Sequence, residues 1–213
     1  TEIDGQFNAT LGLRQPGSTM KPFIYSLALM RGYTRNTVVF DVPTQFSTNC
    51  APTDITNSEP PCYAPQNFDE TYRGPMTFET ALTQSINIPA IKTLYLVGIR
   101  NAVSFATSFG LTSLGDPDRY GLTLVLGGGE VRLLDLTSAY AVFAGDGVRN
   151  TPVGVLEIAD GDGVVLSRYC SSASQIIPAS IARDMSAMLS NNAARSPQSP
   201  TSGPFYFAGY DVA

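Results

Sequence analysis

A Pro-Gly break followed at once by an apolar helical stretch is the feature that most constrains how this chain folds. Pro16-Gly17 interrupts the backbone just before Ser18, and the pattern predicts a helix over residues 18–31 that ends near Gly32. Proline is tolerated only near the start of a helix, so Pro22 requires the helix to begin close to Ser18. Ser18 is therefore expected at a helix N-terminus, where free N–H groups and the positive end of the helix dipole stabilise an oxyanion.

Ser18 and Lys21 form a candidate catalytic pair. Residues three apart share one face of a helix, with Cβ atoms about 5–6 Å apart. At that spacing a neutral lysine amine can take the serine hydroxyl proton and turn a weak nucleophile into a strong one. The chain has no histidine, which excludes a Ser-His-Asp triad, and its only lysines are Lys21 and Lys92. A bare Ser-x-x-Lys match arises readily by chance, and the surrounding break and helix strengthen it without deciding between a catalytic and a structural role.

Composition excludes several functional classes. The 213 residues carry a net charge of −5 and no basic run, so nucleic-acid binding, which needs clustered Lys or Arg, is not expected. No Cys/His metal site is expected, because histidine and paired Cys-x-x-Cys units are missing, and no cofactor is predicted. No run reaches the roughly 18–20 apolar residues of a transmembrane helix, so no membrane segment is predicted in this chain.

The three cysteines leave one structural question open. Cys50 and Cys62 flank a loop rich in Pro, Thr and Asn, and a disulfide between them would close a small ring. Such a bond would indicate an extracytoplasmic location. The alternative is two unrelated loop cysteines, and the sequence favours neither. Cys170 is left over in either case and is interpreted as structural or free.

The rest of the chain predicts helices, one hairpin and one long loop. Residues 40–75 lack periodicity, and loops of that length are usually functional or covering elements. Alternation around an Asp-Gly turn at 160–163 predicts a β-hairpin from residues 153–158 and 163–168. Residues 195–204 are predicted to be a loop. Helices are predicted at 78–84 (with Thr77 as N-cap), 89–97, 100–109, 131–144 and 178–190.

A triple glycine precedes the helix at 131–144. Gly127-Gly128-Gly129 is not a phosphate-binding loop, since no Gly-Lys-Ser/Thr follows it, and a tight turn that opens the helix is expected instead. The buried face of that helix is predicted from its apolar spacing. It comprises Leu133, Leu134, Leu136, Ala139, Tyr140 and Phe143.

Ser85-Ile86-Asn87 is a second candidate motif. It lies between two predicted helices, so a serine hydroxyl that relays a proton and a carboxamide that orients a peptide substrate can face one cleft. The tripeptide pattern is not informative alone, because residues 47–49 and 190–192 match it equally well. The position between helices and the distance downstream of Ser18 favour the copy at 85. The alternative is that Ser85 and Asn87 only cap helices and form a turn.

These motifs, taken in order, resemble the transpeptidase domain of class A penicillin-binding proteins. The resemblance implies an α+β, β-lactamase/transpeptidase-like fold with a five-stranded antiparallel sheet, of which this chain holds mainly the helical part. Residues 1–213 are then a partial domain, and both ends look cut. The stretches that carry the resemblance are residues 14–18 with 21–23, 63–68 (YAPQNF), 81–87 (ALTQSIN), 126–131 (LGGGEV) and 139–144 (AYAVFA).

One family motif is missing. Ser18-x-x-Lys21 and Ser85-x-Asn87 match the first and second motifs, but the third, Lys-Thr-Gly on a strand, does not occur. The apolar stretch 205–213 looks like the approach to it. In this family the third-motif strand carries the second oxyanion donor and binds the substrate carboxylate. Little or no transpeptidase activity is therefore expected of the isolated chain.

The resemblance also implies a function. It is cross-linking of peptidoglycan stem peptides through an acyl-serine at Ser18, with Lys21 as base, Ser85 as proton relay and Asn87 as a substrate contact. The expected partners are stem peptides and β-lactams, and the expected place is the extracytoplasmic face of the bacterial cell membrane. The parent protein is expected to be membrane-anchored, with a glycosyltransferase domain before this region.

Two other functions stay open on the sequence. A β-lactamase or DD-carboxypeptidase shares the first motif but needs a residue that activates water, for which Glu70, Glu79 and Glu130 are the candidates. A non-catalytic β-lactam sensor or structural domain is the second alternative, in which Ser18 is acylated without turnover or not at all.

Overall fold

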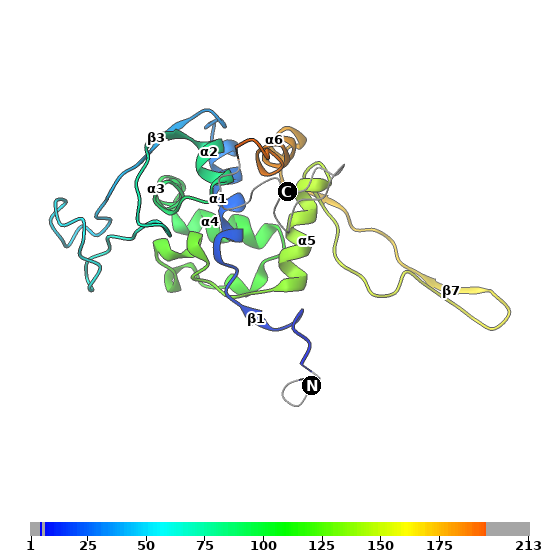
Figure 1. Ribbon diagram of the computed structural model, residues 1–213. Helices are drawn as coiled ribbons and strands as arrows, with labels where there is room; N and C mark the ends of the chain where they lie inside the picture. Colours follow the sequence, from blue (N-terminus) through cyan, green and yellow to red (C-terminus); the bar gives the residue numbers. More distant parts are fainter. Residues whose placement is uncertain (1–4, 6, 195–213) are drawn as a thin grey trace.

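The computed structural model describes residue 5 and residues 7–194, and shows a helical body with one helix at its centre (Figure 1). That central helix, α1, is buried at every position from Lys21 to Leu29. Helices from the rest of the chain surround it. They are α1 (Lys21–Met30), α2 (Phe78–Thr83), α3 (Asn87–Val97), α4 (Ile99–Ser108), α5 (Leu133–Ala144) and α6 (Ala179–Leu189), with 3₁₀ turns η1 (Gly17–Met20), η2 (Thr112–Leu114), η3 (Pro117–Arg119) and η4 (Leu122–Leu126).

The strands form short antiparallel pairs. Within the described residues they make two-stranded sheets only. The pairs are β1 (Leu13–Arg14) with β4 (Val131–Arg132), β2 (Val38–Asp41) with β3 (Gly74–Thr77), β5 (Val148–Arg149) with β8 (Ser174–Gln175), and β6 (Glu157–Ala159) with β7 (Val165–Arg168). This arrangement agrees with the prediction that the chain holds mainly the helical part of an α+β fold.

Aromatic rings bind α1 to the helices around it. The Phe23 ring lies edge-on to Phe109 and Tyr140, with centroids 5.2 and 5.4 Å apart. On the other side of α1, Tyr25 meets Phe78 of α2 in the same geometry at 5.1 Å. Each such buried aromatic side chain contributes about 1.5–3 kcal/mol relative to exposure. The core therefore holds α1 rigidly, and with it the turn that carries Ser18.

The start of α1 differs from the prediction in an informative way. Ser18 lies in the 3₁₀ turn η1, and the α-helix proper begins at Lys21. Pro22 has no N–H to donate to the carbonyl four residues earlier. The carbonyl of Ser18 instead accepts from the Lys21 backbone N–H, a three-residue spacing that tightens the turn. The predicted end is confirmed, because Gly32 follows α1 with φ +94°.

Most other predicted helices are present within one or two residues. Thr77 caps α2 as expected, since its hydroxyl accepts from the Thr80 backbone N–H at 3.1 Å. α3 begins at Asn87 instead of residue 89, so the asparagine of the second motif belongs to the first turn of a helix. Gly98, with φ +80°, separates α3 from α4.

The buried face predicted for α5 is only partly right. Ala139 and Phe143 are buried, but Leu133 and Leu134 are 53% and 43% exposed, so their assignment to the core was wrong. Periodicity places them on the same face, yet the first turn of α5 lies against the N-terminal segment. The Leu134 backbone N–H donates to the Thr10 carbonyl there. The first turn of α5 therefore lies outside the hydrophobic core, and only the later turns of the helix pack against it.

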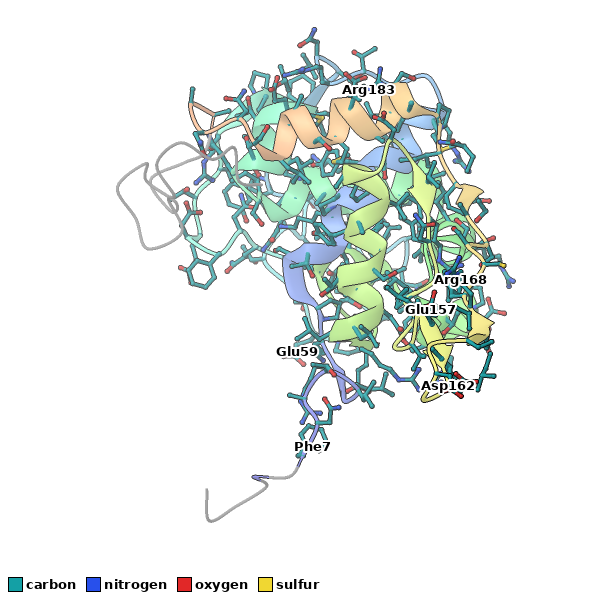
Figure 2. All side chains as sticks on the ribbon, turned by 90° about the vertical axis from the view of Figure 1, so that its right-hand side faces the viewer. Phe7, Glu59, Glu157, Asp162, Arg168 and Arg183 are labelled. Atoms are coloured by element: carbon teal, nitrogen blue, oxygen red, sulfur yellow. A yellow bond between two sulfur atoms is a disulfide. The ribbon has the colours of Figure 1, made fainter. Side chains whose placement is uncertain are left out.

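The predicted hairpin is confirmed and projects from the body. Figure 1 shows β7 at the far side of the molecule from the loop that precedes β3. Glu157 of β6 and Arg168 of β7 lie side by side on the hairpin (Figure 2), and their side chains form an ion pair with an N–O distance of 2.6 Å. The Asp160 carboxylate accepts from the backbone N–H groups of Asp162 and Val164, as a turn residue does.

The cysteine question is answered by the structure. Cys50 and Cys62 form a disulfide, so the alternative of two unrelated loop cysteines was wrong, and Cys170 is free and exposed. The bond closes part of the long loop between β2 and β3, which was predicted as an irregular excursion. The predicted loop at 195–204 and the apolar stretch 205–213 lie outside the described residues.

Candidate active site

Ser18 is presented to solvent by a turn that the fold holds on two sides. Gly17 has φ +60°, a conformation that glycine adopts without strain, and Ser18 is exposed directly after it. The Thr19 carbonyl accepts a hydrogen bond from the Tyr140 hydroxyl of α5 at 2.8 Å. The Ser18 hydroxyl has no hydrogen-bond partner among the residues that the structure describes, so it is free to meet a substrate.

The triple glycine supports this turn by close backbone contact. Gly127 ends η4 with φ +93°, and a Cβ atom at that position would overlap the backbone nitrogen and Cα of Gly17. The sequence predicted a tight turn before α5, and that turn is present. The requirement for glycine, however, comes from a contact 110 positions away in the chain, which the local pattern could not show.

Lys21, three residues after Ser18, is buried, with only 1% of its surface exposed. Its amine donates to the Ser85 carbonyl at 2.6 Å, to the Ser85 hydroxyl at 3.2 Å and to the Asn87 side-chain oxygen at 2.8 Å. Burial disfavours the charged form and lowers the pKa of Lys21 from 10.5 to about 7. A substantial fraction of this amine is therefore neutral at neutral pH and able to accept a proton.

The second motif reaches Lys21 because of an unusual backbone conformation. Ser85 has φ +54°, in the left-handed region, directly after the end of α2. This conformation turns the chain sharply, so that α3 begins two residues later at Asn87. A non-glycine residue in this region carries a cost of about 1–3 kcal/mol. The cost is offset by contacts that place both Ser85 and Asn87 against the lysine amine.

Asn67 is a residue of the site to which the sequence assigned no role. Its side-chain oxygen accepts from the backbone N–H groups of Asn87 and Ile88 at 3.1 and 3.2 Å. Its amide group donates to the Asp41 carboxylate at 2.8 Å and to the Thr71 carbonyl at 2.7 Å. Residues 63–68 contributed to the family resemblance, but no local pattern links Asn67 to a helix that begins 20 residues later.

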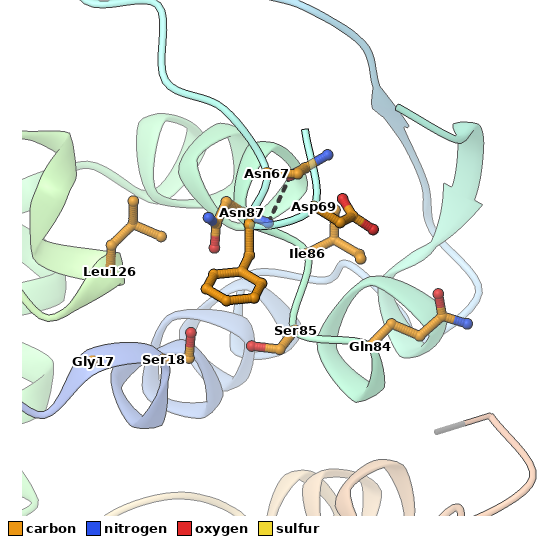
Figure 3. A pocket seen from close by; sticks show the side chains of 10 residues that line it. Gly17, Ser18, Asn67, Asp69, Gln84, Ser85, Ile86, Asn87 and Leu126 are labelled. Atoms are coloured by element: carbon orange, nitrogen blue, oxygen red, sulfur yellow. Dashed lines mark hydrogen bonds between the residues drawn. The ribbon is translucent and has the colours of Figure 1, made fainter. Parts of the chain in front are cut away.

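A cavity of about 300 Å³ joins these residues (Figure 3). Ser18 and Ser85 point into it from neighbouring turns, and Asn87 lies above them. The structure thus brings all four predicted residues together: Ser18, Ser85 and Asn87 line the cavity, and the Lys21 amine donates to the last two. Asp69, which the sequence did not single out, also lines it. A nucleophile, a buried amine, a hydroxyl and a carboxamide suit acyl transfer to serine.

A sequence profile of the penicillin-binding protein transpeptidase domain matches residues 7–213. The chain belongs to this family. Penicillin-binding protein 1A of Neisseria meningitidis is 38% identical over 155 residues, which are 73% of this chain and 18% of that protein. Penicillin-binding protein 1A of Pseudomonas aeruginosa is 35% identical over 153 residues, 72% of this chain and 17% of the relative. The chain therefore spans less than a fifth of these relatives' length.

Solved structures show the same fold. Penicillin-binding protein 1A of Haemophilus influenzae superposes with a TM-score of 0.75 at 26% identity, over 88% of this chain and 31% of that one. Penicillin-binding protein A of Mycobacterium tuberculosis, solved as an imipenem acyl-enzyme complex, superposes with a TM-score of 0.72 at 17% identity. The match covers 92% of this chain and 47% of that one. At that identity the second likeness concerns the fold alone. The predicted class A resemblance and the α+β transpeptidase-like fold are confirmed.

The three glutamates considered for a β-lactamase lie away from this penicillin-binding protein site. Glu79 forms an ion pair with Arg35, which holds the pKa of that carboxyl below its usual range. Glu70 and Glu130 are exposed, and none of the three lines the cavity. Asp69 does line it, but its carboxylate pairs with Arg73, which lowers the pKa of Asp69. Among the carboxylates that the structure describes, none of these four is an unpaired base that lines the cavity.

Two expected absences concern only the described part of this penicillin-binding protein domain. Residues 7–194 contain no group of three His, Cys, Asp or Glu side chains arranged to hold a metal ion. None of the helices described there has the length and apolar character needed to cross a membrane.

Proposed function

We propose that this chain is the D,D-transpeptidase region of a penicillin-binding protein that cross-links peptidoglycan stem peptides through an acyl-serine intermediate at Ser18. The observation that carries the proposal is the buried Lys21 amine, which donates to Ser85 and Asn87, two residues that line one cavity with Ser18. Such an amine supplies the base that a serine nucleophile needs in a chain without histidine.

The first step forms the acyl-enzyme. The neutral Lys21 amine takes the Ser18 hydroxyl proton, and the Ser18 oxygen attacks the carbonyl carbon of the penultimate D-alanine. The oxyanion accepts from the Ser18 backbone N–H, and family resemblance assigns a second donor to the third motif, which does not occur in these 213 residues. The C–N bond to the terminal D-alanine then breaks. Its amine receives the proton from Lys21 by way of the Ser85 hydroxyl, 3.2 Å from the lysine nitrogen.

The second step forms the cross-link. The amine of another stem peptide attacks the ester carbon and loses a proton, which returns through Ser85 and Lys21 to the Ser18 oxygen as that oxygen departs. The Asn87 side-chain oxygen accepts a hydrogen bond from the Lys21 amine, and the Asn87 amide group donates to the Gln66 carbonyl at 3.1 Å. We assign Asn87 the role of orienting the donor peptide while holding the lysine. β-Lactams present a strained amide at the same place and would acylate Ser18.

The location proposed for the parent protein is the extracytoplasmic face of the bacterial cell membrane. The Cys50–Cys62 disulfide supports this, because such bonds persist in oxidising compartments. A membrane anchor, a preceding glycosyltransferase domain and a partial domain over 1–213 remain predictions from the family resemblance.

Acylation by a fluorescent penicillin tests the proposal. The protein should be extended past Ala213 so that it includes a third motif, and intact mass should be recorded for it and for Ser18→Ala. A stable adduct on the first and none on the second is the expected result. An adduct that survives in Ser18→Ala would refute the assignment of the nucleophile.

Two further comparisons separate the alternatives. Rapid loss of the adduct, with release of hydrolysed penicillin, would indicate a β-lactamase instead. Lys21→Ala distinguishes an enzyme from a sensor that uses another route: unchanged acylation would show that the lysine does not drive the reaction. The same assay on residues 1–213 alone should show little turnover, because losing one oxyanion donor typically costs about 10²–10³ in rate.

A further inference from the structure

A buried carboxylate lies behind the second motif without touching the cavity. Asp41, at the end of β2, is fully buried. One of its oxygens accepts from the Asn67 amide group at 2.8 Å, and the other accepts from the Arg73 backbone N–H at 3.0 Å. The Arg73 guanidinium is 3.8 Å from the second oxygen. A buried charge is costly unless it is paired and hydrogen-bonded, and both conditions are met here.

Asn67 uses its whole hydrogen-bonding capacity inside the protein. Its two amide hydrogens go to Asp41 and Thr71, and its oxygen accepts from Asn87 and Ile88. An asparagine side chain offers two donors and two acceptor positions, and all four are filled. Turning the amide over would set its NH₂ against two N–H groups and its oxygen against a carboxylate. The network therefore permits one orientation.

The helix that carries Asn87 depends on this side chain for its cap. The N-cap residue of α3 is Ile86, whose side chain makes no capping hydrogen bond. Unpaired N–H groups in the first turn of a helix need a partner, and capping side chains are worth about 0.5–2 kcal/mol. Asn67 supplies that partner from the loop between β2 and β3. Asn87 in turn accepts from the Lys21 amine at 2.8 Å.

We propose that Asn67 and Asp41 are positioning residues for acylation: Asp41 orients the Asn67 amide, which caps α3 and so holds Asn87 in register with the Lys21 amine. The proposal rests on the function proposed above. It makes the rate of serine acylation depend on Asn67, a residue of the loop between β2 and β3. All the hydrogen-bonding groups of the Asn67 side chain are used inside the protein, so none is free for a substrate. Displacement by about 1 Å of a group that positions a reaction can cost about 10² in rate.

An exchange of the two side chains tests this directly. Asn67→Asp would face Asp41 with a second buried carboxylate, and Asp41→Asn would face Asn67 with a second amide. The double variant, Asp41→Asn with Asn67→Asp, restores one donor and one acceptor in reversed order, and the carboxylate introduced at position 67 can still accept from the first N–H groups of α3. The double variant loses the bond to the Thr71 carbonyl and the charge at position 41 that lies near the Arg73 guanidinium. Asn57→Ala is the matched control, because that amide bonds within the same loop, to Asp54 and Cys62, away from α3.

The measurement is the acylation rate constant with a penicillin, separated from its dissociation constant before bond formation, in the full-length protein that contains this chain. Each single variant should acylate about 10²-fold more slowly, with the dissociation constant changed less than roughly threefold. The double variant should recover at least half of the loss on a logarithmic scale, and Asn57→Ala should acylate like the wild type. Recovery separates positioning from a general loss of folding.

Amide hydrogen exchange gives a second readout that needs no activity. The Asn87 and Ile88 N–H groups should exchange faster in Asn67→Ala than in the wild type, while α6 stays protected. Wild-type acylation in Asn67→Ala, or a double variant no better than the worse single variant, would overturn the proposal. Absence of acylation in the wild type would instead refute the proposed function, and this inference with it.

Discussion

The Lys21 amine nitrogen lies 2.8 Å from the side-chain oxygen of Asn87, a residue 66 positions further along the chain. This contact joins the first motif to the second and holds the lysine amine against Asn87. It also leaves the amine without a carboxylate partner among the described residues, because its three hydrogen bonds go to neutral oxygens of Ser85 and Asn87. No negative charge in the described surroundings of the amine therefore counteracts the effect of burial, which lowers the pKa of Lys21 to about 7.

The first prediction concerns the pH dependence of acylation. Only the neutral amine can take the Ser18 proton, so the acylation rate with a penicillin should rise with pH, with a midpoint at about 7, and level off above it. The measurement is the second-order acylation rate across roughly two pH units on either side of that midpoint, at constant ionic strength. A rate that is flat across this range would show that deprotonation of Lys21 does not limit the step.

The second prediction concerns stability. The pKa of Lys21 is about 7 in the folded protein and 10.5 for a lysine free of this burial, so between these values the unfolded chain binds more protons than the folded one. Stability should therefore rise with pH across this window and lose this contribution below about 7. The difference in unfolding free energy between the wild type and Lys21→Met, from urea titrations at about pH 6 and about pH 9, should shift in favour of the wild type at the higher pH. An equal difference at both values would contradict the lowered pKa.

The third prediction separates the chemistry of Ser85 from its backbone role. Ser85→Gly relieves the cost of φ +54° but loses the hydroxyl that contacts Lys21. Because glycine also adds backbone entropy to the unfolded chain, the two effects on stability should cancel to within about 1 kcal/mol. Acylation should nevertheless fall by about 10²–10⁴, the usual range for loss of a proton-transfer group. Parallel melting curves and acylation rates provide the check, and a full retention of rate would remove Ser85 from the mechanism.

The fourth prediction concerns the glycine beneath the nucleophile. Gly127→Ala should destabilise the protein by about 2 kcal/mol or more, since it adds left-handed strain to an overlap with the Gly17 backbone. It should also slow acylation by moving Ser18. Gly121→Ala is the matched control in the same stretch, because Gly121 has φ −102° and open space around its Cβ position. Equal unfolding free energies for the two variants would show that the contact carries no energy.

Local patterns determined a large part of this protein. The Pro-Gly break, the apolar spacing after it and the position of Pro22 were sufficient to predict α1 and to place Ser18 and Lys21 near its start. The cap at Thr77 and the Asp-Gly turn of the hairpin were predicted in the same way. These features depend on contacts between residues three or four apart, or on the backbone preferences of single residues. Both can be read from the local order of residues in the sequence.

Tertiary structure decided the rest, because it depends on which segments meet. The sequence did not show that Asn67 caps α3, that Gly127 lies on Gly17, or that Leu133 and Leu134 begin their helix outside the core. It likewise left the pairing of Cys50 with Cys62 open. The lowered pKa of Lys21 is the clearest case: the Ser-x-x-Lys spacing places the amine, but its charge is set by the depth to which helices far along the chain bury it.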